Sequence, residues 1–142
     1  MEFNTIPIFV AVMLKRGNEI LLLKRSSTRT YAPNKYHLMG GHVEQGETFC
    51  TAAIREAREE LGIVIQSQDL KFVHMYHRTS IEPTIVVTVF ECVIWQGEIA
   101  NIEPEKHSDV AWFNVNNLPD DMVIPHKNAI ELITQGIAYS EQ

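Results

Sequence analysis

The sequence contains little cysteine, no long apolar run and no excess of basic side chains. Its two cysteines, Cys50 and Cys92, lack the spacing of metal ligands, so we expect buried free thiols in a reducing compartment. The apolar stretch near the N-terminus is interrupted by Pro7 and is too short to span a bilayer. The net charge of −6 argues against the basic footprint that binding to duplex nucleic acid requires. We therefore expect a cytoplasmic protein that binds neither membranes nor nucleic acid.

The length of 142 residues and the ordinary composition, 45% hydrophobic and 21% charged, predict one globular domain over residues 1–142. Apolar and β-branched runs predict strands, and two segments have the features of helices. The expected strands are residues 6–14, 19–24, 36–38, 70–78, 84–95 and 110–115, and the expected helices are residues 48–61 and 125–136. This order indicates an α/β (α+β) fold in which helices cover a mixed sheet.

The most informative segment, which we call the box, is residues 41–63, GHVEQGETFCTAAIREAREELGI. Three of its carboxylates, Glu56, Glu59 and Glu60, fall at i, i+3 and i+4 and therefore share one face of the expected helix. Like charges this close repel one another. A divalent cation would turn the repulsion into coordination, because Mg²⁺ and Mn²⁺ favour carboxylate oxygens. The pattern therefore predicts a metal-binding acidic face.

The same helix has an apolar side. Apolar residues recur at helical spacing and form a stripe that we expect to face the core, while the acidic face points to solvent. The stripe consists of Cys50, Ile54, Ala57 and Leu61. Gly62 suits the left-handed position after the end of a helix.

The identities and spacing within the box resemble the signature of the Nudix hydrolases. The matching residues are Gly41, Glu47, Arg55, Glu56, Glu59, Glu60 and Gly62. Two positions depart from the usual pattern: Ala57 replaces a larger aliphatic residue, and Met39 replaces the proline of a Pro-Gly-Gly. The resemblance implies an α/β/α sandwich with a mixed β-sheet. It also implies hydrolysis of a nucleoside diphosphate linked to another moiety, with Mg²⁺ or Mn²⁺ as cofactor.

The resemblance assigns roles to the acidic face. Glu59 and Glu60 are the implied metal ligands, and Glu56 is either a further ligand or the base that positions the attacking water. The backbone carbonyl of Gly40 is another candidate ligand, because a glycine lets metal and phosphate approach the chain closely.

Other residues are expected to support this centre. Glu47 and Arg55 are the implied pair that positions the loop against the helix. A further metal-binding glutamate is expected from the late loop, the polar segment at residues 96–109, where Glu105 is our choice and Glu103 the alternative. Arg25, at the end of the second strand, is a candidate for contact with the substrate phosphates.

The second half of the chain favours one class of substrate. Residues 101–106 (NIEPEK), 112–113 (WF) and 118–119 (LP) resemble Nudix enzymes that act on nucleoside triphosphates. We therefore expect a pyrophosphohydrolase that converts a nucleoside or deoxynucleoside triphosphate to the monophosphate and pyrophosphate. The alternatives are a nucleotide-sugar or ADP-ribose pyrophosphatase and a catalytically silent nucleotide-binding module. The family resemblance also suggests a homodimer.

Overall fold

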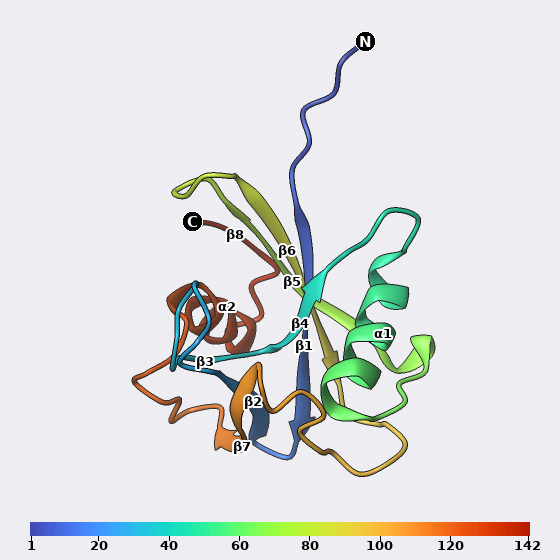
Figure 1. Ribbon diagram of the computed structural model, residues 1–142, viewed down its shortest axis with the longest axis vertical. Helices are drawn as coiled ribbons and strands as arrows, with labels where there is room; N and C mark the ends of the chain where they lie inside the picture. The colour runs from blue at the N-terminus through green and yellow to red at the C-terminus, as the bar shows by residue number, and fades with distance from the viewer.

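The computed structural model describes residues 1–142, which form a mixed sheet of eight strands and two α-helices (Figure 1). The elements are β1 (Ile8–Arg16), β2 (Glu19–Arg25), β3 (Tyr36–His37), β4 (Met39–His42), α1 (Phe49–Leu61), a 3-10 helix η1 (Ser67–Asp69), β5 (Lys71–Arg78), β6 (Ile85–Cys92), β7 (His107–Asn114), α2 (Ile124–Thr134) and β8 (Tyr139–Glu141). The main path of the sheet is β3-β2-β1-β6-β5-β8, while β4 pairs with β1 and β7 with β2. Neither α1 nor α2 combines the length and the apolar character needed to cross a membrane.

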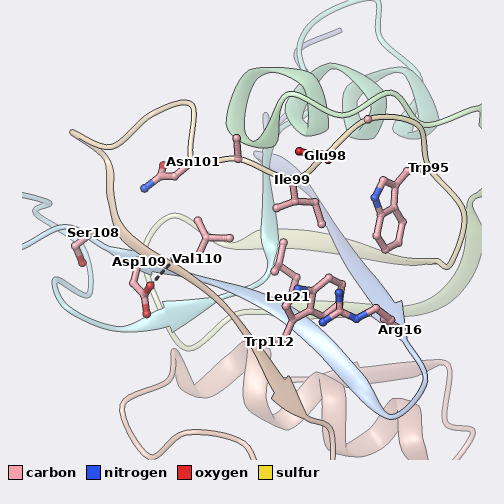
Figure 2. A pocket seen from close by; sticks show the side chains of 12 residues that line it. Arg16, Leu21, Trp95, Glu98, Ile99, Asn101, Ser108, Asp109, Val110 and Trp112 are labelled. Carbon is pink, nitrogen blue, oxygen red and sulfur yellow. Dashed lines mark hydrogen bonds between the residues drawn. The ribbon is translucent and has the colours of Figure 1, made fainter.

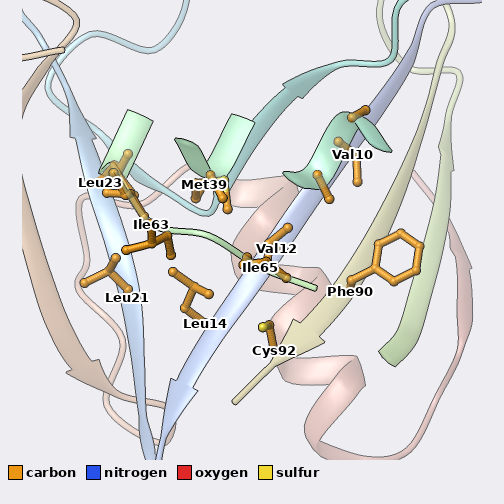
Figure 3. Packing of buried hydrophobic residues seen from close by; sticks show 14 residues of the cluster. Val10, Val12, Leu14, Leu21, Leu23, Met39, Ile63, Ile65, Phe90 and Cys92 are labelled. Carbon is orange, nitrogen blue, oxygen red and sulfur yellow. The ribbon is translucent and has the colours of Figure 1, made fainter. Parts of the chain in front are cut away.

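Strand β1 occupies the middle of the molecule, with α1 and α2 on opposite sides of it (Figure 1). Val10, Val12 and Leu14 belong to the buried cluster that includes α1 (Figure 3). Ala11 and Met13 belong to the cluster that includes α2. Successive side chains of a strand point to opposite faces, so a strand covered on both sides needs an almost continuous apolar run. This arrangement confirms the expected sandwich.

All six predicted strands and both predicted helices are present, with shifted ends. The sequence does not predict β4 or β8. β4 contains two glycines and β8 has three residues, so their extended conformation depends on pairing with β1 and β5 rather than on a local pattern. β7 begins at His107, inside the expected loop, because His107 pairs with Arg25 beyond an irregularity in the β2–β7 register.

Helix α1 has a defined start and end. Thr48 is the N-cap, and its hydroxyl accepts a hydrogen bond from the backbone N–H of Thr51 at 3.1 Å. Gly62 follows the helix with a φ of 70°, and its N–H donates to the carbonyl of Arg58 at 3.0 Å. The predicted left-handed position of Gly62 is therefore confirmed.

The buried stripe of α1 differs from the prediction. Ala57 and Leu61 are fully buried as expected, but Cys50 and Ile54 are only half-buried. The alanines at 52–53 are fully buried instead. Their small side chains let the helix backbone approach β1 and β4 closely, which brings the acidic face toward β4.

Candidate active site

An ion pair joins α1 to the loop that precedes it. Arg55 Nε donates to Glu47 Oε2 at 2.7 Å, and Arg55 Nη2 donates to Glu47 Oε1 at 2.9 Å. The backbone N–H of Glu44 also donates to Glu47 Oε1, at 2.9 Å. These hydrogen bonds, led by those from Arg55, lower the pKa of Glu47 to about 2. Glu47 and Arg55 therefore make the predicted contact, in a two-bonded geometry that fixes their orientation.

Arg55 also reaches the acidic face and the end of β4. Its Nη1 donates to Glu56 Oε1 at 2.9 Å and to Glu59 Oε2 at 3.3 Å. Its Nη2 donates to the backbone oxygen of His42 at 3.0 Å. The hydrogen bonds to Glu47 raise the pKa of Arg55, so the guanidinium stays charged and links loop, helix and strand.

Glu60 is buried, and the prediction that its side chain points to solvent is wrong. Only 6% of the residue is exposed, because α1 packs against β4 at this point. The backbone N–H of Gly40 donates to Glu60 Oε2 at 3.3 Å. Burial, followed by the charge of Glu56, raises the pKa of Glu60 well above its ordinary value. In the protein alone, an ionised Glu60 is therefore destabilising.

Glu56 occupies a similar but less extreme environment. Its side chain is 12% exposed. Burial raises the pKa of Glu56, and the hydrogen bond from Arg55 partly opposes this rise. The neighbouring strand leaves room for the carboxyl group only because residue 41 is a glycine: a Cβ on Gly41 would lie 2.7 Å from the Glu56 carboxyl carbon.

Gly40 lies in β4, where it pairs with Ala11 of β1. Its φ is 156°, and an added Cβ would collide with the carbonyl oxygen of Val10. A side chain is therefore excluded at this position, and the main chain of Gly40 comes next to the carboxyl group of Glu60. The observed contact with Glu60 is made by the N–H of Gly40, and the carbonyl of Gly40 stays a predicted ligand.

Glu59 is the exposed member of the acidic face, with 51% of its side chain accessible. Its ion pair with Arg55 is an i,i+4 contact at the helix surface, and such pairs contribute little to stability. The side chain of Glu59 can therefore turn toward a ligand without a large loss of folding free energy.

The late loop is tied to the end of α1 by the backbone. Ile102 N–H donates to the carbonyl of Glu60 at 3.1 Å, and Glu103 follows directly. The charge of Glu103 contributes, after burial and Glu56, to the raised pKa of Glu60. Glu105 is exposed and makes no hydrogen bond or ion pair with the box. The placement therefore favours Glu103, the alternative, over Glu105 as a late carboxylate for this centre.

Arg25, the candidate phosphate contact, lies at the end of β2. Its Nε donates to the backbone oxygen of Tyr31 at 2.7 Å. Burial lowers the pKa of Arg25, and the negative charge of Glu60 acts in the opposite direction. Arg25 is therefore within electrostatic reach of the acidic face.

The comparison with known proteins agrees with this geometry. A family model described as the NUDIX domain matches residues 5–133. The chain belongs to the Nudix family. Residues 41–63 are accordingly its Nudix box.

Relatives of the Nudix domain act on different substrates. An ADP-ribose pyrophosphatase from Methanocaldococcus jannaschii is 30% identical over 84% of this chain and 68% of its own length. The nucleoside triphosphatase NudI of Escherichia fergusonii is 30% identical over 77% of this chain and 82% of its own length. The chain also matches the NAD-capped RNA hydrolase NudC of Stutzerimonas stutzeri, but it spans only 36% of that protein.

The solved structures include a close match to the fold. The crystal structure of a MutT NUDIX hydrolase from Burkholderia pseudomallei aligns with a TM-score of 0.81 at 25% identity. The alignment covers 90% of this chain and 98% of that one. The eight-stranded mixed sheet with two covering helices is therefore the Nudix fold.

The acidic face of the Nudix domain has the chemistry of a site for a divalent metal. Its donors are carboxylate oxygens and one backbone carbonyl, which Mg²⁺ and Mn²⁺ prefer. Glu56 and Glu60 adjoin each other with raised pKa values, and a cation would compensate both charges. In the protein alone, no three His, Cys, Asp or Glu side chains converge on one point, and Arg55 holds Glu56 and Glu59. We therefore expect Glu59 to leave Arg55 when metal binds.

A group of three histidines beside the box, of which His37 and His107 are buried and His126 is half-buried, was not indicated by the sequence. His37 comes from β3, His107 from β7 and His126 from α2. The ring centroids of His37 and His107 are 5.4 Å apart, and those of His37 and His126 are 6.1 Å apart. The three residues are distant in sequence and follow no motif, so the fold alone brings them together.

A cavity of about 610 Å³ lies apart from the acidic face (Figure 2). Its walls include β2, β7 and the loop at residues 95–101. Trp95 stacks on Trp112 with ring centroids 6.2 Å apart, and Arg16 lies 4.1 Å above the Trp112 ring. None of the carboxylates of the Nudix box lines this cavity, so it is separate from the candidate active site.

Proposed function

We propose that the protein is a metal-dependent pyrophosphohydrolase that cleaves a nucleoside or deoxynucleoside triphosphate to the monophosphate and pyrophosphate. The observation that carries the proposal is the burial of Glu56 and Glu60 on the acidic face, where the protein does not fully compensate their charges and their pKa values are raised. The similarity to a nucleoside triphosphatase over 82% of that relative supports the triphosphate. Residues 101–106, NIEPEK, support it as well.

The metal would be held by side chains of α1 and by the main chain of β4. Glu59 and Glu60 would supply carboxylates and Gly40 its carbonyl oxygen, while Glu56 would be either a further ligand or the base. We infer that Glu103 completes the set, because its charge acts on Glu60. A bound Mg²⁺ or Mn²⁺ would neutralise phosphate oxygens and lower the pKa of a bound water.

The remaining roles belong to side chains of the chain itself. Glu56 is the candidate base, because burial raises its pKa toward the range in which a carboxylate accepts a proton efficiently. Arg55 and Glu47 fix the position of α1 relative to the preceding loop, and with it the position of Glu56 for this proton transfer. Arg25 is the candidate for binding phosphate oxygens as the bridging P–O bond breaks, because its charge interacts with that of Glu60.

The test is a panel of substrates with Mg²⁺ and with Mn²⁺, in which products are separated by chromatography and identified by phosphorus NMR. The panel contains the eight common ribo- and deoxyribonucleoside triphosphates, ADP-ribose and a nucleotide sugar. We expect a triphosphate to give the highest kcat/KM, with pyrophosphate as a product. Release of orthophosphate alone from every triphosphate would contradict the proposed bond cleavage.

ADP-ribose is the second candidate substrate, because an ADP-ribose pyrophosphatase is 30% identical to this protein over 84% of the chain. A kcat/KM for ADP-ribose above that of every triphosphate would replace the first proposal. Tight nucleotide binding without any turnover would indicate a catalytically silent module. The homodimer and the cytoplasmic location stay predictions, which size-exclusion chromatography with light scattering and cell fractionation test directly.

A further inference from the structure

One side chain of the late loop closes the segment that contains both late carboxylates. Asn101 Nδ2 donates to the backbone oxygen of His107, the first residue of β7, at 2.7 Å. β7 pairs with β2 on one side only, so the main chain along its other edge has no strand partner. The Asn101 amide supplies a partner there and joins the two ends of the segment 102–106, in which Glu103 and Glu105 lie.

The main chain of His107 connects this hydrogen bond to Glu103. Its carbonyl accepts from Asn101, and its N–H donates to the carbonyl of Glu103 at 3.0 Å. The carbonyl of Glu103 also accepts from the N–H of Lys106, at 2.9 Å. One residue, His107, is therefore bonded both to the side chain of Asn101 and to the residue that carries the late carboxylate favoured by the structure.

The main chain on both sides of Asn101 is fixed to the end of α1. The N–H of Ala100 donates to the carbonyl of Leu61 at 3.0 Å, and the N–H of Ile102 donates to the carbonyl of Glu60 at 3.1 Å. Asn101 is thus held against the helix that carries the acidic face. Its amide consequently fixes the start of β7, and with it the main chain of Glu103, relative to Glu60.

The carboxylate of Glu103 has little else to hold its direction. Its ion pair with Lys106 Nζ, at 3.1 Å, is an i,i+3 contact to a lysine whose side chain is 51% exposed. Exposed pairs of this kind contribute little free energy and rearrange easily. The direction of the Glu103 side chain therefore depends on the main chain of the loop.

Only one half of the Asn101 amide is paired within the protein. The carbonyl of His107 can only accept, so the nitrogen of the amide faces it and Oδ1 points away. Oδ1 is buried and makes no hydrogen bond, which is destabilising. The stabilising hydrogen bond and the unpaired oxygen oppose each other, so the net contribution of Asn101 to the stability of the fold is small.

We propose that Asn101 is a positioning residue, whose amide holds the late loop so that the Glu103 carboxylate is directed at the metal on the acidic face. Side chains that orient a metal ligand without touching the metal contribute to metal affinity through that ligand. The inference rests on the proposed function, because it takes Glu103 as the late ligand.

Two substitutions remove the hydrogen bond to His107. Asn101→Ala deletes the amide, and Asn101→Leu replaces it with an apolar group of similar size that also eliminates the buried unpaired oxygen. The matched control is Asn114→Ala. Asn114 ends the same strand, away from Glu103, and its Oδ1 accepts a local hydrogen bond from the N–H of Asn116 at 2.8 Å.

The experiment is a titration of the full chain with Mn²⁺ alone, in which electron paramagnetic resonance measures the free ion. We expect Asn101→Ala and Asn101→Leu each to raise the dissociation constant about fivefold, and no more than Glu103→Gln does. Asn114→Ala should not change it. In the Glu103→Gln background, Asn101→Ala should cause no further change, because a positioning residue acts only through the ligand that it orients.

Several results would overturn the inference. Unchanged Mn²⁺ binding in both Asn101 variants, an equal effect of Asn114→Ala, or a full effect of Asn101→Ala in the Glu103→Gln background would each do so. A wild type that binds no Mn²⁺ would overturn it as well. The titrations need no turnover, so a wild type that binds Mn²⁺ but hydrolyses no nucleotide would refute the proposed function alone. Thermal unfolding shows that each variant is folded, and the midpoint of Asn101→Leu should stay close to that of the wild type.

Discussion

The outer and inner carboxylates of the Nudix box lie in opposite electrostatic environments. Glu47, at the outer end, accepts two hydrogen bonds from the Arg55 guanidinium, and its pKa falls to about 2. Glu60, at the inner end, is buried beside Glu56, and its pKa rises well above the ordinary value. At neutral pH, the same type of residue therefore stabilises the fold at one end of the box and destabilises it at the other.

The difference separates two roles that the motif itself does not distinguish. A carboxylate whose charge is fully paired by protein groups holds the structure in place, as Glu47 does. A buried carboxylate whose charge is left uncompensated marks a position for a cation, and Glu60 meets that description. Substitutions should therefore lower activity at both ends, while stability rises at the inner end and falls at the outer end.

The largest effect is expected at the inner end. Glu60→Gln should lower kcat about 100-fold or more, since even the outer partners of metal ligands contribute 10- to 100-fold. The same change should raise the free energy of unfolding in chelator, because it removes a buried charge. Steady-state kinetics at saturating Mg²⁺ and urea unfolding measure the two quantities. Glu59→Gln is the control, which should lose activity without a gain in stability; near-wild-type rates in both variants would refute the metal assignment.

At the outer end, Arg55→Lys keeps the charge but loses the two-bonded contact with Glu47. We expect kcat to fall about 10- to 100-fold and the midpoint of thermal unfolding to decrease, because the loop and helix lose their fixed orientation. Arg58→Lys, at an exposed position of the same helix, should leave both unchanged. A fall in kcat without any change in unfolding would mean that Arg55 contacts substrate rather than the loop.

An intermediate effect is expected in the late loop, where the sequence favours Glu105 as the metal ligand and the structure favours Glu103. Glu103→Gln should raise the Mg²⁺ concentration for half-maximal activity about tenfold, because Glu103 acts on Glu60. Glu105→Gln should change it less, because Glu105 is exposed and apart from the box. Metal titrations of activity at fixed substrate provide the comparison. The reverse order would restore Glu105 as the late ligand.

The smallest effect is the pH dependence of stability without metal. Glu60 has a raised pKa, so its contribution is fully favourable below the ordinary value of 4.5 and is lost as the pH rises through the raised value. Glu47 has a lowered pKa, so its contribution is present above 4.5 and is lost as the pH falls through about 2. In urea unfolding with chelator, the free energy of unfolding should therefore fall as the pH rises above 4.5, and Glu60→Gln should reduce this fall. The free energy of unfolding should also fall in acid, and Glu47→Gln should reduce that loss. If stability changed with pH in the same way in Glu60→Gln and Glu47→Gln, the proposed electrostatic difference between the two ends of the box would be wrong.

Local patterns in the sequence predict much of the fold. The apolar run of β1 and the glycine at position 62 depend on interactions within a few residues, and each is found as expected. Local patterns do not predict β4, because its two glycines favour extended structure only where β1 pairs with them. They also misplace Glu60, since its burial depends on how closely α1 approaches β4.

The sequence by itself determined the family and the candidate residues for its chemistry, because the Nudix box is a contiguous segment with fixed spacing. Only the tertiary structure decided which of its carboxylates are paired and which are buried, because desolvation and charge compensation come from neighbouring strands. The same holds for His37 and His126, which lie far apart in the chain and both make hydrogen bonds with the backbone of one residue, Leu38.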